Sequence, residues 1–221
     1  MSKVFFTSDL HFGHNKIMQF CPAFRRFETT LQMDEALINL WNTQICKDDI
    51  IYDLGDFSFH KNLNDIKKVL RRLDGHHILV LGNHDQIIRD NKDELLNGFK
   101  NDGNKMLDEI TDYKEISLQD SKENWHKFVL FHYPLNEWNK GHYGTILLYG
   151  HLHDELASIK GKALNVSYDL HGNILSIDEV LEYVKDIEPF LHHKSKVFGD
   201  DDLLEIRKIL IKNKLKRINF D

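Results

Sequence analysis

An alternation of strand-like and helix-like segments at the start of the chain limits its fold most strongly. Apolar runs of β type occupy residues 3–8, 49–56 and 76–85, and each run ends in polar residues. Between these runs, apolar side chains recur at helical spacing from Met33 to Ile45 and from Ile66 to Leu73. The order strand, helix, strand, helix, strand predicts an α/β fold with a parallel sheet covered by helices.

The rest of the chain predicts more strands and several helices. Capping-box patterns at Thr29–Gln32 and Ser176–Glu179 mark two helix starts. We divide the chain into one domain over residues 1–186 and a C-terminal helical extension over residues 187–221, which we expect to pack on or near that domain. The other predicted elements are a short helix over 93–99, strands over 110–118, 126–132, 144–153 and 163–169, a helix after Ser176, and a last helix that includes Leu203 to Leu210.

The composition is that of an ordinary soluble protein. With 221 residues, of which 41% are hydrophobic, the chain is long enough for one domain with a substantial core. The net charge of -6 argues against an extended grip on nucleic acid, which usually needs a basic surface. Cys21 and Cys46 lack the spacing of a thiolate zinc site and fit a reducing compartment. Because no signal peptide or membrane span is evident, we expect a cytoplasmic protein.

Five predicted strands end in side chains that suit a metal ion. The carboxyl ends of parallel strands gather at one edge of an α/β sheet, where ligands bind. Side chains two positions apart on a strand point to the same side, so each DxH or HxH pair is expected to reach one centre. Glycines before three of these residues let the chain turn sharply. The endings are Asp9-Leu10-His11, Gly55-Asp56, Gly82-Asn83-His84-Asp85, His132 and Gly150-His151-Leu152-His153.

The donors in these endings are too many for a single metal ion. A tetrahedral zinc site needs about four ligands. Seven donors without a thiolate suit two metal ions that share a bridging carboxylate, about 3.5–4 Å apart in such sites. Imidazole and carboxylate together suit Mn, Fe, Zn, Ni or Co. The seven predicted ligands are Asp9, His11, Asp56, Asn83, His132, His151 and His153.

The five endings, in this order, resemble the calcineurin-like metallophosphoesterase family. Its motifs read D-x-H, G-D, G-N-H-D/E, H and G-H-x-H, and all of them occur between residues 9 and 153. Around these motifs, "SDLHFGHNKI", "LGDFSF", "FHYPL", "YGHLH" and "NVSYD" resemble small bacterial and phage members of that family. The resemblance reaches about residue 184, and the segment 187–221 has no counterpart in it.

The resemblance implies a fold, a ligand set and a reaction. The fold is a four-layer α/β/β/α sandwich of the metallo-dependent phosphatase type. Two divalent ions, with Mn²⁺ favoured, activate water for attack on a phosphate ester. His84 is implied to assist the leaving group and Asp85 to orient His84. The first metal takes Asp9, His11, Asp56 and His153, and the second takes Asp56, Asn83, His132 and His151, with Asp56 bridging.

The function that follows is a metal-dependent phosphoesterase, and a phosphodiesterase acting on a small, nucleotide-like phosphate ester is favoured. A phosphomonoesterase of the same family is the alternative, and a non-catalytic scaffold on the same fold is a second. A DNA nuclease of the break-repair type would need extra DNA-binding segments, and a lipid pyrophosphatase an apolar entry for acyl chains. A protein Ser/Thr phosphatase would need other residues after Asp56 than Phe57-Ser58-Phe59-His60. The oligomeric state is left open.

Several polar residues stay outside the predicted site. His14 and Asn15 are candidates for a phosphate contact, and Trp138, Asn139 and His142 are candidates for the wall of a substrate cleft.

The remaining histidines, arginines and cysteines are expected to have no part in the site. We interpret Arg25 and Arg26 as surface charges rather than phosphate clamps, and neither cysteine receives a role. The histidines expected to be structural or exposed are His76, His77, His126, His192 and His193.

Overall fold

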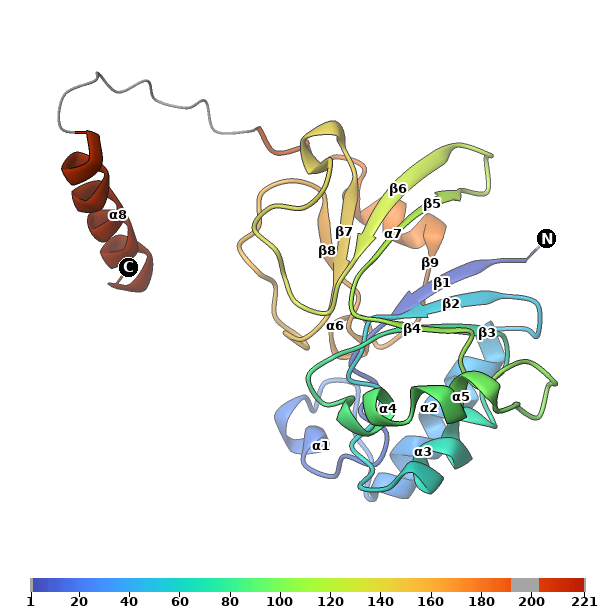
Figure 1. Ribbon diagram of the computed structural model, residues 1–221. Helices are drawn as coiled ribbons and strands as arrows, with labels where there is room; N and C mark the ends of the chain where they lie inside the picture. The colour runs from blue at the N-terminus through green and yellow to red at the C-terminus, as the bar shows by residue number, and fades with distance from the viewer. Residues whose placement is uncertain (1, 192–202, 221) are drawn as a thin grey trace. The chain divides into compact units, whose positions relative to one another are not determined.

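The computed structural model describes residues 2–191 and 203–220. Two sheets form its centre, one with the strand order β4-β3-β2-β1-β9 and one with β5-β6-β7-β8 (Figure 1). The strands are β1 Val4–Thr7, β2 Ile50–Asp53, β3 His76–Val80, β4 Glu109–Thr111, β5 Lys114–Gln119, β6 Trp125–Leu130, β7 Ile146–Tyr149, β8 Ala163–Asn165 and β9 Leu175–Ser176. The α helices are α1 Ile17–Phe20, α2 Thr30–Gln44, α3 Leu63–Leu70, α4 Gln86–Asp90, α5 Lys92–Asn97, α6 Tyr168–His171, α7 Ile177–Val184 and α8 Leu203–Phe220.

The direction of the strands decides at which edge of each sheet a site can form. Strands β1 to β4 run parallel, and only the short β9 pairs antiparallel with β1. In the other sheet β6, β7 and β8 run parallel, while β5 is antiparallel to β6. The predicted α/β class is therefore confirmed, with two mixed sheets. The segments that follow β1, β2, β3, β6 and β7 all leave from carboxyl ends of parallel strands.

Alternation along the first sheet divides its side chains between two cores. Phe5, Ile51 and Leu79 belong to a buried cluster that also contains apolar residues of α2 and α3. Their neighbours Phe6, Tyr52 and Val80 belong to a second cluster shared with the strands of the other sheet and with α7. Helices therefore cover one face of the first sheet, and the second sheet packs on its other face (Figure 1).

The outer face of the second sheet is not covered by the layer of α helices that the family resemblance implied. Val129 and Leu147 of this sheet pack in a third cluster with Trp138 and Phe190. The covering residues come from loops and from a 3-10 turn at Gly141–Tyr143. In the described part of the chain this fourth layer is not α-helical, because α7 buries its apolar face in the core between the two sheets.

Several predicted strands are wrong in their extent, and the one over 144–153 is limited to β7 Ile146–Tyr149. Residues 110–118 contain the end of β4 and most of β5, with Asp112 and Tyr113 between the two strands. Strand β4 pairs in one sheet and β5 in the other. Alternation of apolar residues does not reveal such a change of sheet. The strand predicted over residues 163–169 ends at Asn165. The Ser167 hydroxyl accepts a hydrogen bond from the N–H of Asp169 and so caps a helical turn there.

The chain forms two compact units, residues 1–190 and 191–221. The predicted boundary after residue 186 comes too early, because Phe190 is buried in the third cluster of the first unit. The predicted last helix is confirmed as α8, in which residues 207–216 are exposed. That the extension packs on the first unit stays a prediction. Within the described ranges, no helix has the length and apolar character needed to cross a bilayer.

Candidate metal centre

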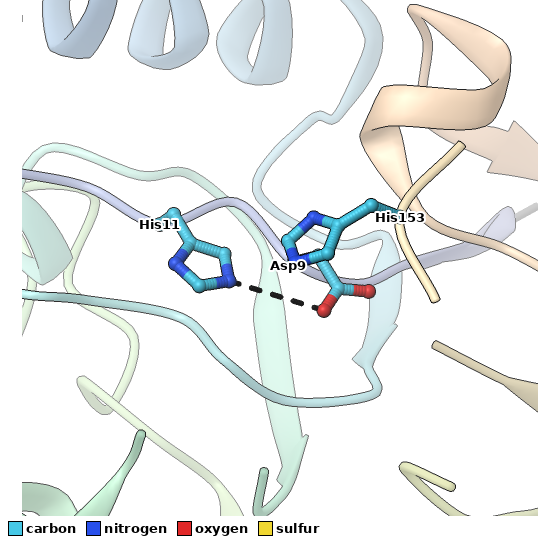
Figure 2. A group of neighbouring side chains, drawn as sticks. All are labelled: Asp9, His11 and His153. Atoms are coloured by element: carbon cyan, nitrogen blue, oxygen red, sulfur yellow. Dashed lines mark ion pairs between the residues drawn. The ribbon is translucent and has the colours of Figure 1, made fainter. Parts of the chain in front are cut away.

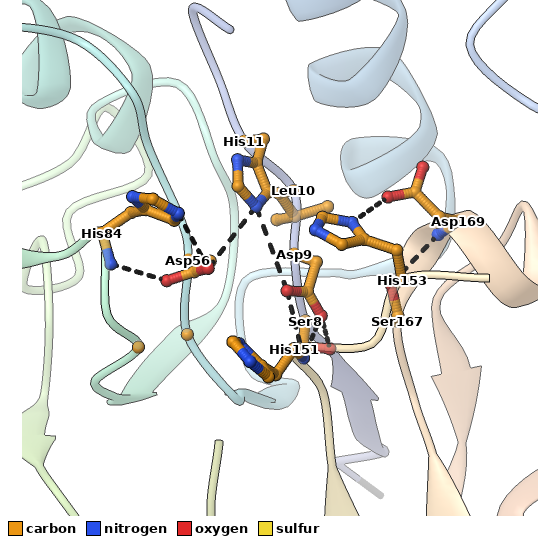
Figure 3. A network of polar contacts seen from close by, with 12 residues as sticks. Ser8, Asp9, Leu10, His11, Asp56, His84, His151, His153, Ser167 and Asp169 are labelled. Atoms are coloured by element: carbon orange, nitrogen blue, oxygen red, sulfur yellow. Dashed lines mark hydrogen bonds and ion pairs between the residues drawn. The ribbon is translucent and has the colours of Figure 1, made fainter. Parts of the chain in front are cut away.

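The segments that follow five strands bring the predicted ligands together, and Figure 3 labels Asp9, His11, Asp56, His151 and His153 among them. Asp9 and His11 follow β1, and Asp56 follows β2. From the second sheet, His132 follows β6, while His151 and His153 follow β7. Asn83, after β3, joins them because its Oδ1 lies 3.2 Å from Nε2 of His132.

The first cluster of ligand atoms consists of Asp9, His11 and His153 (Figure 2). One ligand atom from each lies within 4.8 Å of the others. His11 is only 2% exposed, and neither of its ring nitrogens has a hydrogen-bond partner among the described residues. A buried imidazole with two unpaired nitrogens is costly. A metal ion at this cluster would give Nε2 of His11 the partner that it lacks.

The second cluster consists of Asp56, His132 and His151, whose ligand atoms also lie within 4.8 Å of one another. His132 is fully buried, and its Nδ1 lies 2.7 Å from the carbonyl oxygen of Leu54. With Nδ1–H donating to that carbonyl, the lone pair of Nε2 is free for a metal, as in many metal-bound histidines. This hydrogen bond also ties the second sheet to the end of β2.

Asp56 belongs to the second cluster and also faces the first. Its Oδ2 is 3.6 Å from Nε2 of His11 and 3.5 Å from Nε2 of His132. Burial acts to raise the pKa of Asp56, but the nearby imidazoles of His11 and His132 outweigh burial and hold that pKa far below its usual range. The position suits a carboxylate that bridges two metal ions. The oxygen and imidazole donors of the two clusters therefore fit a pair of divalent ions.

The backbone that presents these ligands is not extended, as the i, i+2 argument assumed. Strand β1 ends at Thr7, and the ligands lie in the loops beyond the strands. Five of the ligands have a left-handed φ between 52° and 71°. Such a conformation costs about 1–3 kcal/mol for a non-glycine residue and is concentrated at functional sites. The residues are Asp9, His11, Asp56, His151 and His153.

Two of the three glycines serve close approach rather than turning. Gly55 has a φ of +97°, as a sharp turn requires. Gly82 and Gly150 are not left-handed. A Cβ on Gly150 would lie 2.5 Å from Oδ2 of Asp9, and one on Gly82 would lie 2.2 Å from Oδ1 of Asp56. Both glycines therefore leave room for an adjacent carboxylate of the site.

Gly82→Ala is expected to weaken metal binding because the new methyl group would push against Asp56. We expect the affinity for Mn²⁺ to fall by about 10- to 100-fold, as when the support of a metal ligand is disturbed. Isothermal titration with Mn²⁺ measures this loss. Gly98→Ala is the control, since the added Cβ there would meet the flexible side chain of Met106. Equal affinity in both variants would show that Gly82 has no such role.

A buried ion pair behind His153 was not predicted. Nδ1 of His153 lies 2.7 Å from Oδ2 of Asp169, which holds the ring and leaves Nε2 free (Figure 3). Asp169 in turn accepts hydrogen bonds from Arg25, with 2.5 Å between Nε and Oδ1. Asp169 ends the "NVSYD" segment, for which the sequence predicted a strand and a family resemblance but no part in the site.

The interpretation of Arg25 as a surface charge is wrong. Arg25 is 1% exposed, whereas the neighbouring Arg26 is exposed. Its guanidinium also donates to the carbonyl oxygens of Asp9, at 2.6 Å, and Leu10, at 2.9 Å. Arg25 therefore supports the left-handed loop that carries Asp9 and, through Asp169, the ring of His153.

The resemblance implied that Asp85 orients His84, but the structure gives Asp85 another role. Its carboxylate is buried and accepts hydrogen bonds from the backbone N–H groups of Gly82, Asp56 and Phe57. Burial raises the pKa of Asp85 to about 6. Asp85 fixes the loop of Asp56 against the loop after β3, so it positions the carboxylate that would bridge two metal ions.

His84 lies at the edge of the site and has an exposed side chain (41%). Its backbone N–H donates to Oδ1 of Asp56 at 2.8 Å, and its Nε2 lies 3.9 Å from Oδ2 of the same carboxylate. Its ring packs against Phe59 with 4.5 Å between centroids. Burial lowers the pKa of His84, and the charge of Asp56 opposes that shift. The ring is thus close to the carboxylate that would bridge the metals and is open to solvent.

The candidates for a phosphate contact and those for the wall of a substrate cleft differ in where the structure places them. His14 lies beside the site, since its ring stacks on Phe59 at 3.8 Å and is 5.3 Å from the ring of His11. Asn15 is exposed. Trp138 packs with Phe190 in the outer core of the second sheet, so it does not line the metal centre. Its neighbours stay with that layer, because Asn139 bonds to Glu115 and the ring of His142 lies 4.0 Å from that of Tyr143.

The remaining histidines agree with a structural interpretation. His77 is fully buried next to Asp53, while His76 and His126 pair with Asp108 and Asp120. His192 and His193 lie outside the described residues.

Cys21 lies closer to the site than expected. Its Sγ is within 4.8 Å of ligand atoms of His153 and Asp169. Burial raises the pKa of this thiol to about 12, so it stays protonated, and Asp169 is already bound by Arg25. Cys46 is exposed.

No family model matches the chain, but several known proteins are similar to it. An uncharacterized protein of Methanocaldococcus jannaschii is 28% identical over 84% of this chain and 93% of its own length. A crystal structure of a protein of unknown function from Aquifex aeolicus aligns with a TM-score of 0.60 at 22% identity, over 83% of this chain and all of that chain. The gene 66 protein of Mycobacterium phage D29 is 30% identical over 85% of this chain and 98% of its own length. The chain belongs to the family of this phage protein.

Proposed function

We propose that the protein is a metal-dependent phosphohydrolase of the calcineurin-like metallophosphoesterase type, acting in the cytoplasm as a phosphodiesterase on a small, nucleotide-like phosphate ester. The fold is compatible with the four-layer sandwich of that family, with loops in place of the outer helices. The observation that carries the proposal is the position of Asp56, whose Oδ2 lies within 3.6 Å of imidazole nitrogens from both ligand clusters.

In this proposal the clusters hold two divalent ions. Asp9, His11, Asp56 and His153 would hold one, and Asp56, Asn83, His132 and His151 the other. Mn²⁺ is the favoured ion, and Fe, Zn, Ni or Co also suit these donors. When bound, such ions lower the pKa of water and offset the negative charge of a phosphoryl group.

The side chains themselves orient the ester and serve the leaving group. His84 is not one of the ligands, and its ring faces solvent next to Asp56. From this position Nε2 can donate a proton or a hydrogen bond to the oxygen that leaves the phosphorus atom. A general acid of this kind contributes roughly 10²–10⁴-fold to the rate. Asp85 and Arg25 hold the loops of Asp56 and Asp9 in place throughout the reaction.

His84→Ala is expected to keep both metal ions and to lose turnover by about 10²–10⁴-fold, since only the acid group is removed. Metal analysis by mass spectrometry and hydrolysis of bis-p-nitrophenyl phosphate measure the two effects on the same sample. His76→Ala is the control, because His76 is at the opposite end of β3 and pairs with Asp108. Near wild-type turnover in His84→Ala would rule out the role of His84.

The reaction class is tested with two chromogenic esters and added Mn²⁺. Turnover of bis-p-nitrophenyl phosphate in preference to p-nitrophenyl phosphate is the expected result for a phosphodiesterase. A preference for the monoester would replace the diesterase by a phosphomonoesterase. If protein with bound metal hydrolyses neither ester, the proposal fails, and a scaffold that binds partners through this face becomes the better account.

A further inference from the structure

A cavity of ≈ 270 Å³ opens directly beside the metal centre. Asn83 and His84 belong to its wall, so it is continuous with the site where the ester would react. Phe59, Lys61 and Gln86 contribute other parts of the wall, and none of the described residues that line it is acidic. Since the whole chain carries 35 Asp and Glu against 29 Lys and Arg, the absence of acidic groups from this wall is notable.

Lys61 gives the cavity an available positive charge. Its Nζ lies 4.6 Å from the centroid of the Phe59 ring. It forms no ion pair with any residue in the described ranges. The two lysines of the following helix differ, because Lys67 pairs with Glu94 and Lys68 with Asp65. An ammonium group held over an aromatic ring, without a carboxylate partner, is suited to an anionic ligand.

The same geometry argues against a nucleobase in this cavity. A base would need a free aromatic face on which to stack. The His14 ring stacks on Phe59 at 3.8 Å with an interplanar angle of 8°, which fills one face. Lys61 Nζ lies over the same ring at 4.6 Å and the His84 ring packs against it at 4.5 Å, so little of the ring is left for a base. The cavity therefore offers charge rather than a stacking surface.

We propose that this cavity binds a second phosphate group of the substrate, carried on the leaving-group side of the ester, and that Lys61 recognises it. The link to the reaction is His84, which both lines the cavity and lies 3.9 Å from the carboxylate of Asp56. The proposal rests on the proposed phosphohydrolase function and narrows its substrates to esters whose leaving group bears a phosphate.

Binding of two small ligands to the Mn²⁺-loaded protein tests this proposal. The ligands are 1,3-propanediol bisphosphate and 1,3-propanediol monophosphate, and isothermal titration gives both dissociation constants. We expect the bisphosphate to bind about tenfold more tightly than the monophosphate, which corresponds to one charge-assisted contact. In Lys61→Gln the two ligands are expected to bind equally, and Lys61→Arg is expected to restore the difference.

Lys68→Gln is the matched control, because Lys68 is exposed and already paired with Asp65. It should leave the ratio of the two dissociation constants unchanged. A ratio near one in the wild-type protein, or a ratio retained in Lys61→Gln, would overturn the role of the cavity. Hydrolysis of bis-p-nitrophenyl phosphate, which lacks a second phosphate, should be the same in Lys61→Gln and wild type. If the wild-type protein does not hydrolyse that ester, the proposed function fails, whatever the binding ratio shows.

Discussion

Asp56→Asn is expected to release bound metal and to abolish hydrolysis. The carboxylate faces both ligand clusters, so its loss would remove a ligand from each. Loss of an outer-shell partner alone lowers metal affinity or activity by about 10–100-fold, and we expect the loss of this ligand to exceed that range. Metal content after dialysis and turnover of bis-p-nitrophenyl phosphate measure the effect.

The asparagine variant should still fold. Its amide oxygen can accept the hydrogen bond that the N–H of His84 now donates to Oδ1 of Asp56. Asp53→Asn is a matched control from the same strand end, because Asp53 is fully buried next to His77 and is not a ligand. Burial raises the pKa of Asp53 well above its usual value, so a neutral amide is a mild change there. Unchanged metal content in Asp56→Asn would refute the bridging role.

Arg25→Met is expected to be the most destabilising single change. It would leave the carboxylate of Asp169 buried without its cation and would remove the donors to the carbonyl groups of Asp9 and Leu10. Breaking a buried pair in this way lowers the free energy of unfolding by about 3–5 kcal/mol. Urea denaturation of the metal-free protein measures this loss directly.

Arg26→Met provides the control for Arg25, since it makes the same chemical change at the next, exposed position. We expect its effect on the free energy of unfolding to stay within about 0.5 kcal/mol, as for most surface substitutions. If Arg25→Met and Arg26→Met were equally stable, the buried pair would not support the loop of Asp9. Arg25→Met should also bind Mn²⁺ more weakly, because Asp169 would then hold the ring of His153 less firmly.

The grouping of the candidate ligands was predictable because each of them closely follows a strand. Parallel strands bring their carboxyl ends to one edge whatever the lengths of the helices between them. The sequence therefore predicted correctly that Asp9 and Asp56, which follow neighbouring strands of the first sheet, lie together, whereas the approach of His132 depends on how the second sheet packs on the first. Their local conformation was not predictable in the same way. The left-handed φ of Asp9 and Asp56 depends on hydrogen bonds between loops that are distant in sequence.

The sequence did not predict correctly the residues that support the candidate ligands. Arg25 has the sequence environment of a surface arginine, with another arginine beside it, and only the fold shows that it reaches Asp169. The family resemblance implied that Asp85 orients His84, but the carboxylate of Asp85 instead accepts hydrogen bonds from the backbone N–H groups of Asp56 and Phe57. Contacts of this kind depend on where loops meet in space, and periodicity and spacing carry no information about that.

The change of sheet between β4 and β5 is a third example. Apolar residues continue through 110–118, so the pattern predicted a single strand. The chain instead passes from one sheet to the other at Asp112 and Tyr113, which lie between the two strands. A strand pattern records which side chains are buried, and it does not record which neighbour the strand pairs with.

The central claim, a dinuclear centre that hydrolyses a phosphate ester, is tested most directly by titrating metal-free protein with Mn²⁺ while hydrolysis of bis-p-nitrophenyl phosphate is followed. The account predicts no turnover without metal and a rise that reaches its plateau at two equivalents of Mn²⁺ per chain, in keeping with the two ligand clusters. Full activity at one equivalent, or turnover that does not depend on metal, would contradict it.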